Sequence, residues 1–142
     1  IRAVRADLLW AAGFVVGSPE YHGSMTGATK NWFDHYYHEF AGKCFALVGA
    51  TGGGPGTSCF THMRATVQFC HGWTLPYHVG VEAAKFRPDG PPEDPKILER
   101  LTRLGRDIAV YSQLLNQQFE TDLDQSPAPG FASFHQRRRR QS

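Results

Sequence analysis

Apolar residues gather along the chain in three short, nearly continuous runs. These runs are FVVGS at residues 14–18, KCFALVGA at 43–50 and LPYHVGVEA at 75–83. Runs of this length without strict alternation are typical of strands buried on both faces, as in a parallel sheet. The pattern therefore predicts three strands.

Around these runs the apolar positions recur every three or four residues, which is the spacing of amphipathic helices. Thr26 and Asp94 are suitable N-terminal caps, and Pro95 suits a first helical turn. The spacing predicts helices over residues 1–11, 26–40, 58–71 and 95–119. The last of these has a long apolar stripe: Ile97, Leu98, Leu101, Leu104, Ile108, Tyr111 and Leu115.

Helices and strands are expected to alternate along the chain. This order predicts an α/β fold in which a parallel sheet lies between two layers of helices. Ligands of such sheets bind outside the carboxyl ends of the strands. Two glycine-rich segments, residues 17–27 and 51–57, follow two of the expected strands directly. We therefore expect them to form the rim of a binding site.

Charge is unevenly distributed. The 142 residues include 15 basic and 13 acidic side chains, a net charge of +2. The run Arg137–Arg140 supplies more than this excess, so the rest of the chain is not a basic surface for nucleic acid. No apolar run approaches the roughly 20 residues of a membrane span. We expect no nucleic-acid or membrane partner, a folded domain over residues 1–120 and a disordered basic tail over 121–142.

Cysteines and histidines raise two alternatives, a metal site and a catalytic thiol. Three cysteines without a CxxC motif argue against a disulfide framework and fit reduced thiols in the cytoplasm. We expect no metal, because three pairs do not complete a zinc pattern: His35–His38, Cys59–His62 and Cys70–His71. Cys59, just inside an expected helix, is either a reactive thiol or a small core residue.

The glycine-rich segments do not complete a nucleotide-binding motif. Gly49 and Gly54 have the spacing of a Walker A loop, but Pro55 stands where that loop needs lysine. Glycine nevertheless lets backbone N–H groups approach a flat ligand closely, and Tyr21 can supply an aromatic flank. A flavin needs such a slot, whereas a tight strand-to-helix turn is the alternative reading of residues 51–57.

SPEYHGSMTGATKN at residues 18–31, with Asp34 beyond it, resembles the signature of the NAD(P)H-dependent FMN reductase family. GKCFALVGATGGG at 42–54 resembles the next strand and second flavin loop of that family. The resemblance spans residues 7–82. It implies a flavodoxin-like three-layer sandwich with a parallel sheet over residues 1–120. It also implies FMN as cofactor and NAD(P)H as co-substrate.

The resemblance also implies which residues border the flavin. They are Pro19, Glu20, Tyr21, His22, Gly23, Ser24, Thr51, Gly52, Gly53 and Gly54. No side chain is expected to be catalytic, because the flavin carries the chemistry. Lys30, Asn31 and Asp34 match the motif and are expected to fix the loop and the helix.

The chain departs from the family pattern in two ways. His22 stands where many relatives have asparagine, and both side chains can donate a hydrogen bond. The phosphate-binding loop and the first strands of the family have no counterpart in the printed sequence, so we expect them to be missing from it. We then expect unpaired strand edges at Val15 and Val48. We also expect the chain alone to aggregate and to bind FMN weakly.

The expected function is an FMN-dependent reductase that takes hydride from NAD(P)H. Its acceptor would be a quinone, a free flavin, an azo compound or a metal oxyanion. Relatives form dimers or tetramers, and the aromatic residues of 31–40 suggest an interface, so we expect a cytoplasmic homodimer or homotetramer. Two alternatives are a flavodoxin-like electron carrier and a non-catalytic flavodoxin-like binding domain.

Overall fold

A computed structural model describes residues 2–82, 90 and 92–139. Its helices are α1 (Arg2–Trp10), α2 (Gly27–Asp34), α3 (Thr57–Phe69), α4 (Pro95–Asp124) and α5 (Ser133–Arg139), with a short 3₁₀ helix, η2 (Gly130–Ala132). Its strands are β1 (Gly13–Tyr21), β2 (Ser24–Met25), β3 (Cys44–Thr51), β4 (Trp73–Thr74) and β5 (Val79–Glu82). The alternation expected from the sequence is therefore confirmed.

The strand β3 forms the centre of a sheet whose main pairings are parallel. β1 pairs with one edge of β3, in register from Gly13 opposite Cys44 to Pro19 opposite Ala50. β4 and β5 lie in line along the other edge, β4 beside the start of β3 and β5 beside its end. β2 turns back antiparallel onto the end of β1. Of the strand expected over residues 75–83, only Val79–Glu82 forms a strand, and β4 comes before that range; residue 83 lies outside the described residues.

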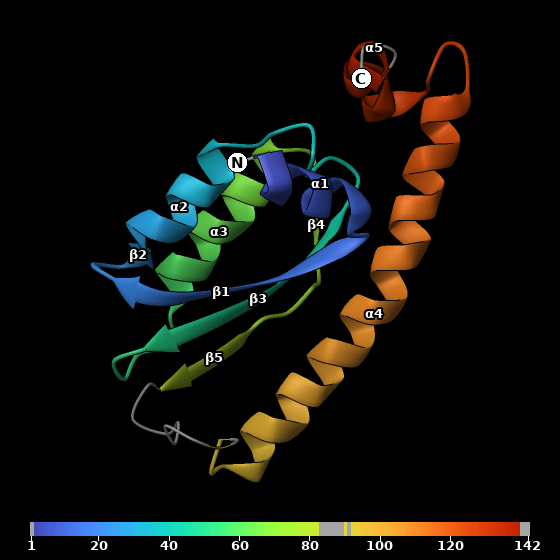
Figure 1. Cartoon of the computed structure of the whole chain (residues 1–142). Coiled ribbons are helices and arrows are strands. Elements are labelled where there is room, and N and C mark those ends of the chain that lie inside the picture. Colours follow the sequence, from blue (N-terminus) through green and yellow to red (C-terminus); the bar gives the residue numbers. More distant parts are fainter. Residues whose placement is uncertain (1, 83–89, 91, 140–142) are drawn as a thin grey trace.

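Helices cover both faces of this sheet: α2 and α3 lie over one face, and α4 crosses the other (Figure 1). The layer of α2 and α3 is joined to the sheet by a largely aromatic and aliphatic cluster that includes Phe33, Phe45, Phe60, Met63 and Val67. The layer of α4 is joined by a second cluster that includes Ala46, Val79, Val81, Leu104 and Ile108. These layers are the three-layer sandwich expected from the sequence.

α4 is longer than its apolar stripe predicted. Asp94 caps its start, since the carboxylate accepts the Lys96 N–H at 2.9 Å. The helix continues past residue 119 to Asp124, and Phe119 packs closely against Gly42, where an added Cβ would lie 2.2 Å from Phe119 Cγ. No helix in the described part of the chain is both long and apolar enough to cross a membrane.

Lys43 ties α1 to the start of β3. Its Nζ, on a residue only 6% exposed, donates to the carbonyl oxygens of Leu8 at 2.5 Å and Leu9 at 3.1 Å, and also to that of Ala11. These carbonyls lie at the end of α1, where helical acceptors lack partners and the helix dipole is negative. Burial lowers the pKa of Lys43 to about 8. The lysine thus acts as a cap supplied from outside the helix.

α2 ends at Asp34, six residues earlier than predicted. The chain continues in turns in which the Phe40 N–H donates to Tyr37 O at 3.3 Å and the Ala41 N–H to His38 O at 3.4 Å. These turns leave Tyr36 and Phe40, like Phe33, almost completely buried. The aromatic residues of 31–40 are therefore mainly core residues, and they give little support to an interface there.

The sequence predicted unpaired strand edges at Val15 and Val48, and among the described residues the structure agrees only at Val15. Val15 lies on β1, and the outer edge of β1 along residues 13–19 has no strand partner among the described residues. Its side chain is 58% exposed. Val48 instead lies on β3 between Gly17 of β1 and Val79 of β5. The expectation of an open edge at Val48 was wrong, because β5 fills that position.

Residues 121–139 differ from the disordered tail expected over 121–142. They form the end of α4, then η2 and α5, and Ala128 and Ala132 pack against Phe119. His135 of α5 is 5% exposed and lies between two other imidazoles. Its Nδ1 is 2.9 Å from Nδ1 of His38, and its Nε2 is 2.8 Å from Nδ1 of His71. Residues 140–142 lie outside the described residues.

We predict that this imidazole row makes stability pH-dependent. Burial, and next the charges of His38 and His71, lower the pKa of His135 from 6.5 to about 4. Between these values the unfolded chain binds more protons, so stability falls as the pH drops from about 6.5 to 4, by up to about 3 kcal/mol. Urea unfolding at several pH values measures this loss.

His135→Leu should flatten the pH dependence of the unfolding free energy over that window. His35→Leu is the matched control, because His35 is exposed on the surface after α2. An equally steep pH dependence in His135→Leu and in the unaltered chain would contradict this role of His135.

Candidate functional site

The pairing of β1 with β3 places the two glycine-rich segments next to each other. Pro19 lies opposite Ala50, so Glu20 and Thr51 follow side by side at the carboxyl edge of the sheet. The arrowheads of both strands lie at the same end of the molecule in Figure 1. This is the edge at which parallel α/β sheets bind ligands.

The first segment is a tight hairpin and not the open loop expected from its composition. Pro19, Glu20 and Tyr21 extend β1, and Tyr21 pairs with Ser24 of β2. The two residues between them have positive φ angles, 53° at His22 and 74° at Gly23. A two-residue turn with both φ angles positive matches the twist of the flanking strands. The Tyr21 side chain is left 62% exposed.

The hairpin rests on the first turns of α3. The Cys59 N–H donates to Glu20 Oε1 at 3.4 Å, and Nδ1 of His62 lies 3.0 Å from Oγ of Ser24. Free N–H groups at a helix start favour such a carboxylate. Glu20 and Ser24 therefore both contact α3. These two contacts fix the hairpin, which contains the site residues expected at 19–24.

On its other side the hairpin is fixed to α2 through a small hydroxyl network. Ser18 Oγ accepts the Thr26 N–H at 2.9 Å, and Thr26 Oγ1 accepts the Thr29 N–H at 3.2 Å. Thr26 is thus the N-cap of α2 that the sequence predicted. The role of Ser18 was missed, although a buried serine beside a strand end is a usual signal for such a bond.

The second segment presents bare backbone. Thr51 is buried, and its hydroxyl donates to the Gly54 carbonyl at 2.8 Å, which holds the turn closed. A Cβ added at Gly52, Gly53 or Gly54 would meet no heavy atom within 4 Å. The backbone here is therefore free on its outer side, and the φ of 135° at Gly53 favours glycine.

A cavity of about 400 Å³ adjoins this second segment, with Thr51, Gly54, Pro55 and His78 in its lining. The His78 imidazole stacks on Phe60 with ring centroids 3.8 Å apart. Burial, and next the charges of Arg64 and Arg100, lower the pKa of His78, so that it stays neutral at neutral pH. His78 was missed from the sequence because its only signal there is a histidine inside an apolar run.

The three residues that match the rest of the motif lie on α2, away from the bare backbone. Lys30 Nζ donates to Asp34 Oδ1 on the exposed side of the helix. Asn31 Nδ2 lies 3.4 Å from Nε2 of His35. These are one-turn contacts within a single helix, so they stabilise α2 and bring no polar group to the edge of the sheet.

The alternative of a reactive thiol at Cys59 lacks physical support. The residue is 1% exposed, and its Sγ lies 3.9 Å from Sδ of Met63. Burial, and next the charge of Glu20, raise the pKa of the thiol. It therefore stays protonated at neutral pH. Among the described residues, no group of three or more histidine, cysteine or acidic side chains is arranged to hold a metal ion.

The arrangement suits a flat ligand with polar edges. The second segment offers unobstructed backbone at Gly52–Gly54, and the first offers the exposed side chain of Tyr21 at the same edge of the sheet. This matches the requirements of a flavin ring. Neither segment has a serine- or arginine-rich loop of the kind that a phosphate group needs.

Comparisons with known proteins identify the family of the chain. A sequence model of the family described as NADPH-dependent FMN reductase matches residues 1–85. The FMN-dependent NADPH-azoreductase of Staphylococcus saprophyticus is 35% identical over 75 residues, which are 52% of this chain and 40% of the relative. That of Staphylococcus aureus is 31% identical over 86 residues, 60% of this chain and 43% of the relative. The matched part is thus less than half of these relatives.

Solved structures show the same fold. An oxidoreductase from Corynebacterium diphtheriae superposes with a TM-score of 0.66 and 19% identity, covering 82% of this chain and 62% of that chain. The apo form of an NADH:FMN oxidoreductase, EmoB, gives a TM-score of 0.63 and 18% identity, covering 80% and 59%. At this identity the likeness concerns the fold, which is flavodoxin-like. Because the family match covers more than half of the sequence, this chain belongs to the NADPH-dependent FMN reductase family.

Proposed function

We propose that this chain is part of an FMN-dependent oxidoreductase that transfers hydride from NAD(P)H to flavin and electrons on to a small-molecule acceptor. One observation carries the proposal. The hairpin at residues 19–24 and the glycine segment at 51–54 follow adjacent parallel strands at the same edge of the sheet, the first with an exposed tyrosine and the second with an unobstructed backbone. Bound FMN would accept the hydride and pass the electrons on.

The residues proposed to border the cofactor are those expected from the sequence: Pro19, Glu20, Tyr21, His22, Gly23, Ser24, Thr51, Gly52, Gly53 and Gly54. Gly52–Gly54 would supply backbone N–H groups to the polar edge of the ring, since no Cβ stands in the way. Tyr21 would cover an apolar part of the ring. Glu20 and Ser24 would act mainly by holding the hairpin on α3, where both have partners.

Among possible acceptors we favour an azo compound, because the relatives from both Staphylococcus species are named azoreductases. The other proposed acceptors are a quinone, a free flavin and a metal oxyanion. The same names favour NADPH over NADH.

Buried free thiols at Cys44, Cys59 and Cys70 support the proposed cytoplasmic location. A homodimer or homotetramer is also proposed, with exposed aromatic residues such as Phe69, 78% exposed, as contacts.

The direct test is anaerobic reduction of the flavin-loaded protein. We expect NADPH to bleach the absorbance of oxidised flavin, and an azo dye added afterwards to restore it. An electron carrier would be bleached by a chemical reductant but not by NADPH. If neither NADPH nor NADH bleaches the absorbance of flavin bound to the protein, the proposed function is contradicted.

Gly23→Val should weaken FMN binding at least tenfold, which corresponds to about 1.4 kcal/mol. The φ of 74° at this position is costly for a β-branched residue, so the hairpin should be displaced. An added Cβ would meet only Ser58 Cβ, at 3.8 Å, so the strain lies in the backbone. Quenching of flavin fluorescence measures the dissociation constant.

Gly105→Val is the matched control. It adds the same side chain on α4, at a position where nothing lies within 4 Å of a new Cβ. We expect it to leave FMN affinity unchanged. An unchanged affinity in a folded Gly23→Val protein would remove the hairpin from the proposed site.

Riboflavin tests the phosphate separately. If residues 1–142 contact only the ring, riboflavin and FMN should bind this chain with dissociation constants within about threefold of each other, a difference below about 1 kcal/mol. Charge-assisted hydrogen bonds to a phosphate would add more than that. A preference for FMN of tenfold or more would show a phosphate site within the chain and contradict this prediction.

A further inference from the structure

A second cavity opens at the opposite end of the sheet from the proposed flavin segments. Its volume is about 420 Å³, within the range of roughly 300–1,000 Å³ that small-molecule sites occupy. Trp73 in its wall pairs with Cys44 at the start of β3, whereas Thr51 ends that strand. Seven residues of strand separate the two positions, a distance of about 23 Å. The aromatic end of this cavity is therefore distant from the proposed flavin segments, whereas Arg64 at its other end contacts His78, which lines the cavity beside the second segment.

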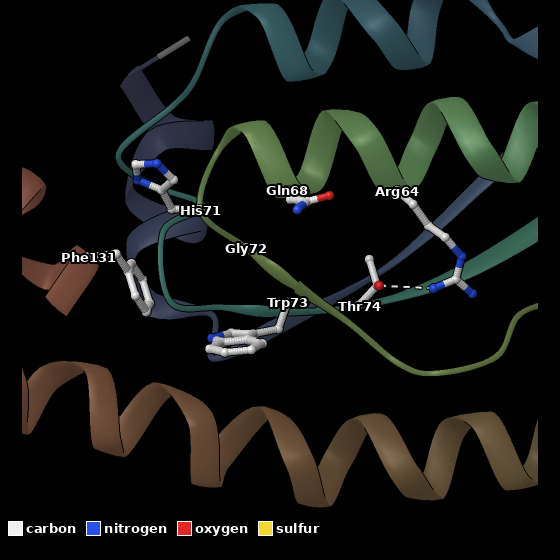
Figure 2. Close-up of a pocket in the computed structure, with 7 residues that line it drawn as sticks. All are labelled: Arg64, Gln68, His71, Gly72, Trp73, Thr74 and Phe131. Atoms are coloured by element: carbon white, nitrogen blue, oxygen red, sulfur yellow. Dashed lines mark hydrogen bonds between the residues drawn. The ribbon is translucent and has the colours of Figure 1, made fainter.

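One end of this cavity is aromatic. Trp73 and Phe131 have ring centroids 6.1 Å apart at an interplanar angle of 72°, and His71 lies 6.0 Å from Phe131 at 65°. The Trp73 side chain is 47% exposed, which is high for an indole with aromatic neighbours. Figure 2 shows Phe131 and His71 at one end and Trp73 between them and Arg64. These rings pack edge to face against one another, and the exposed part of Trp73 leaves an aromatic surface for a planar guest.

The other end of the cavity has a fixed positive charge. Nη1 of Arg64 donates to Thr74 Oγ1 and to the Leu75 carbonyl, both at 3.0 Å. Nη2 lies 3.2 Å from Nδ1 of His78. All three partners are uncharged, and within the described residues no carboxylate forms an ion pair with this guanidinium. A guanidinium has five N–H groups, so two of them have no acceptor in the part of the chain that the structure describes.

We propose that this cavity binds a small planar aromatic carboxylate, with its ring against the exposed part of Trp73 and its carboxylate at Arg64. The guanidinium is already oriented by Thr74 and Leu75, so little side-chain freedom is lost when a carboxylate binds. Charge-assisted hydrogen bonds from Arg64 would select the anion. The aromatic end would select a flat ring over a compact anion such as acetate.

The C-terminal segment is part of this site. Phe131 comes from η2, and the adjoining α5 is docked through His135 to His71, which also lines the cavity. The aromatic end is therefore complete only while residues 125–139 are docked, because they supply Phe131. Binding of the carboxylate should in turn favour the docked segment, because a ligand stabilises the state to which it binds.

The test uses 2-naphthoate and its neutral analogue 2-naphthamide, titrated into isotope-labelled protein and followed by NMR. We expect naphthoate to shift the Trp73 indole and the amide signals of residues 71–75, and naphthamide to bind at least fivefold more weakly. Arg64→Gln should weaken naphthoate at least tenfold, or about 1.4 kcal/mol, and leave naphthamide unchanged. Arg103→Gln is the matched control, since Arg103 on α4 is exposed and pairs with Glu99.

Three outcomes would overturn the proposal. They are equal affinity for naphthoate and naphthamide, naphthoate shifts confined to residues 19–24 and 51–54, and the absence of any shift at millimolar naphthoate. The comparison of the two ligands needs no substitution, so it decides the question even if Arg64→Gln fails to fold. None of these outcomes depends on flavin binding or turnover.

Discussion

The parallel pairing of β1 with β3 is the contact on which the proposed site depends. It is strictly registered, because close approaches leave no room for a shift. A Cβ at Gly13 would lie 2.5 Å from Ser112 Cβ on α4, and one at Gly49 would lie 2.6 Å from Phe60 Cζ on α3. A slip by one residue would also turn Val16 from the core to the opposite face. With this register, the hairpin and the glycine segment end at the same level.

The two ends of the sheet have different chemistry because different residues surround them. At the carboxyl end, glycine leaves backbone groups bare and Tyr21 exposed. At the amino end, Lys43 caps α1 and three imidazoles join the C-terminal segment to the core. The first arrangement suits a neutral flat ring with polar edges. The second, with Arg64 beside Trp73, suits an aromatic anion. Each end would thus have its own ligand preference, set by backbone at the carboxyl end and by side chains from several elements at the amino end.

The fold was largely predictable from the sequence because its strands are short apolar runs and α4 has a regular stripe. The family was recognisable from the motif around Tyr21 and Gly23, whereas the residues expected to border the flavin stay a prediction. The end of α2 was not predictable, since the burial of Tyr36 and Phe40 in turns depends on the space left by the sheet. Nor was the ordered C-terminal segment, because its composition is polar and His135 is buried only through partners 97 and 64 residues away.

The most direct measurement of the central claim is the set of backbone amide signals that shift when flavin is added. We expect the NMR shifts to concentrate at residues 19–24 and 51–54, at the carboxyl end of the registered pair of strands. Shifts concentrated at Arg64, Trp73 and Phe131, with residues 51–54 unaffected, would place the flavin at the other end of the sheet and contradict the account.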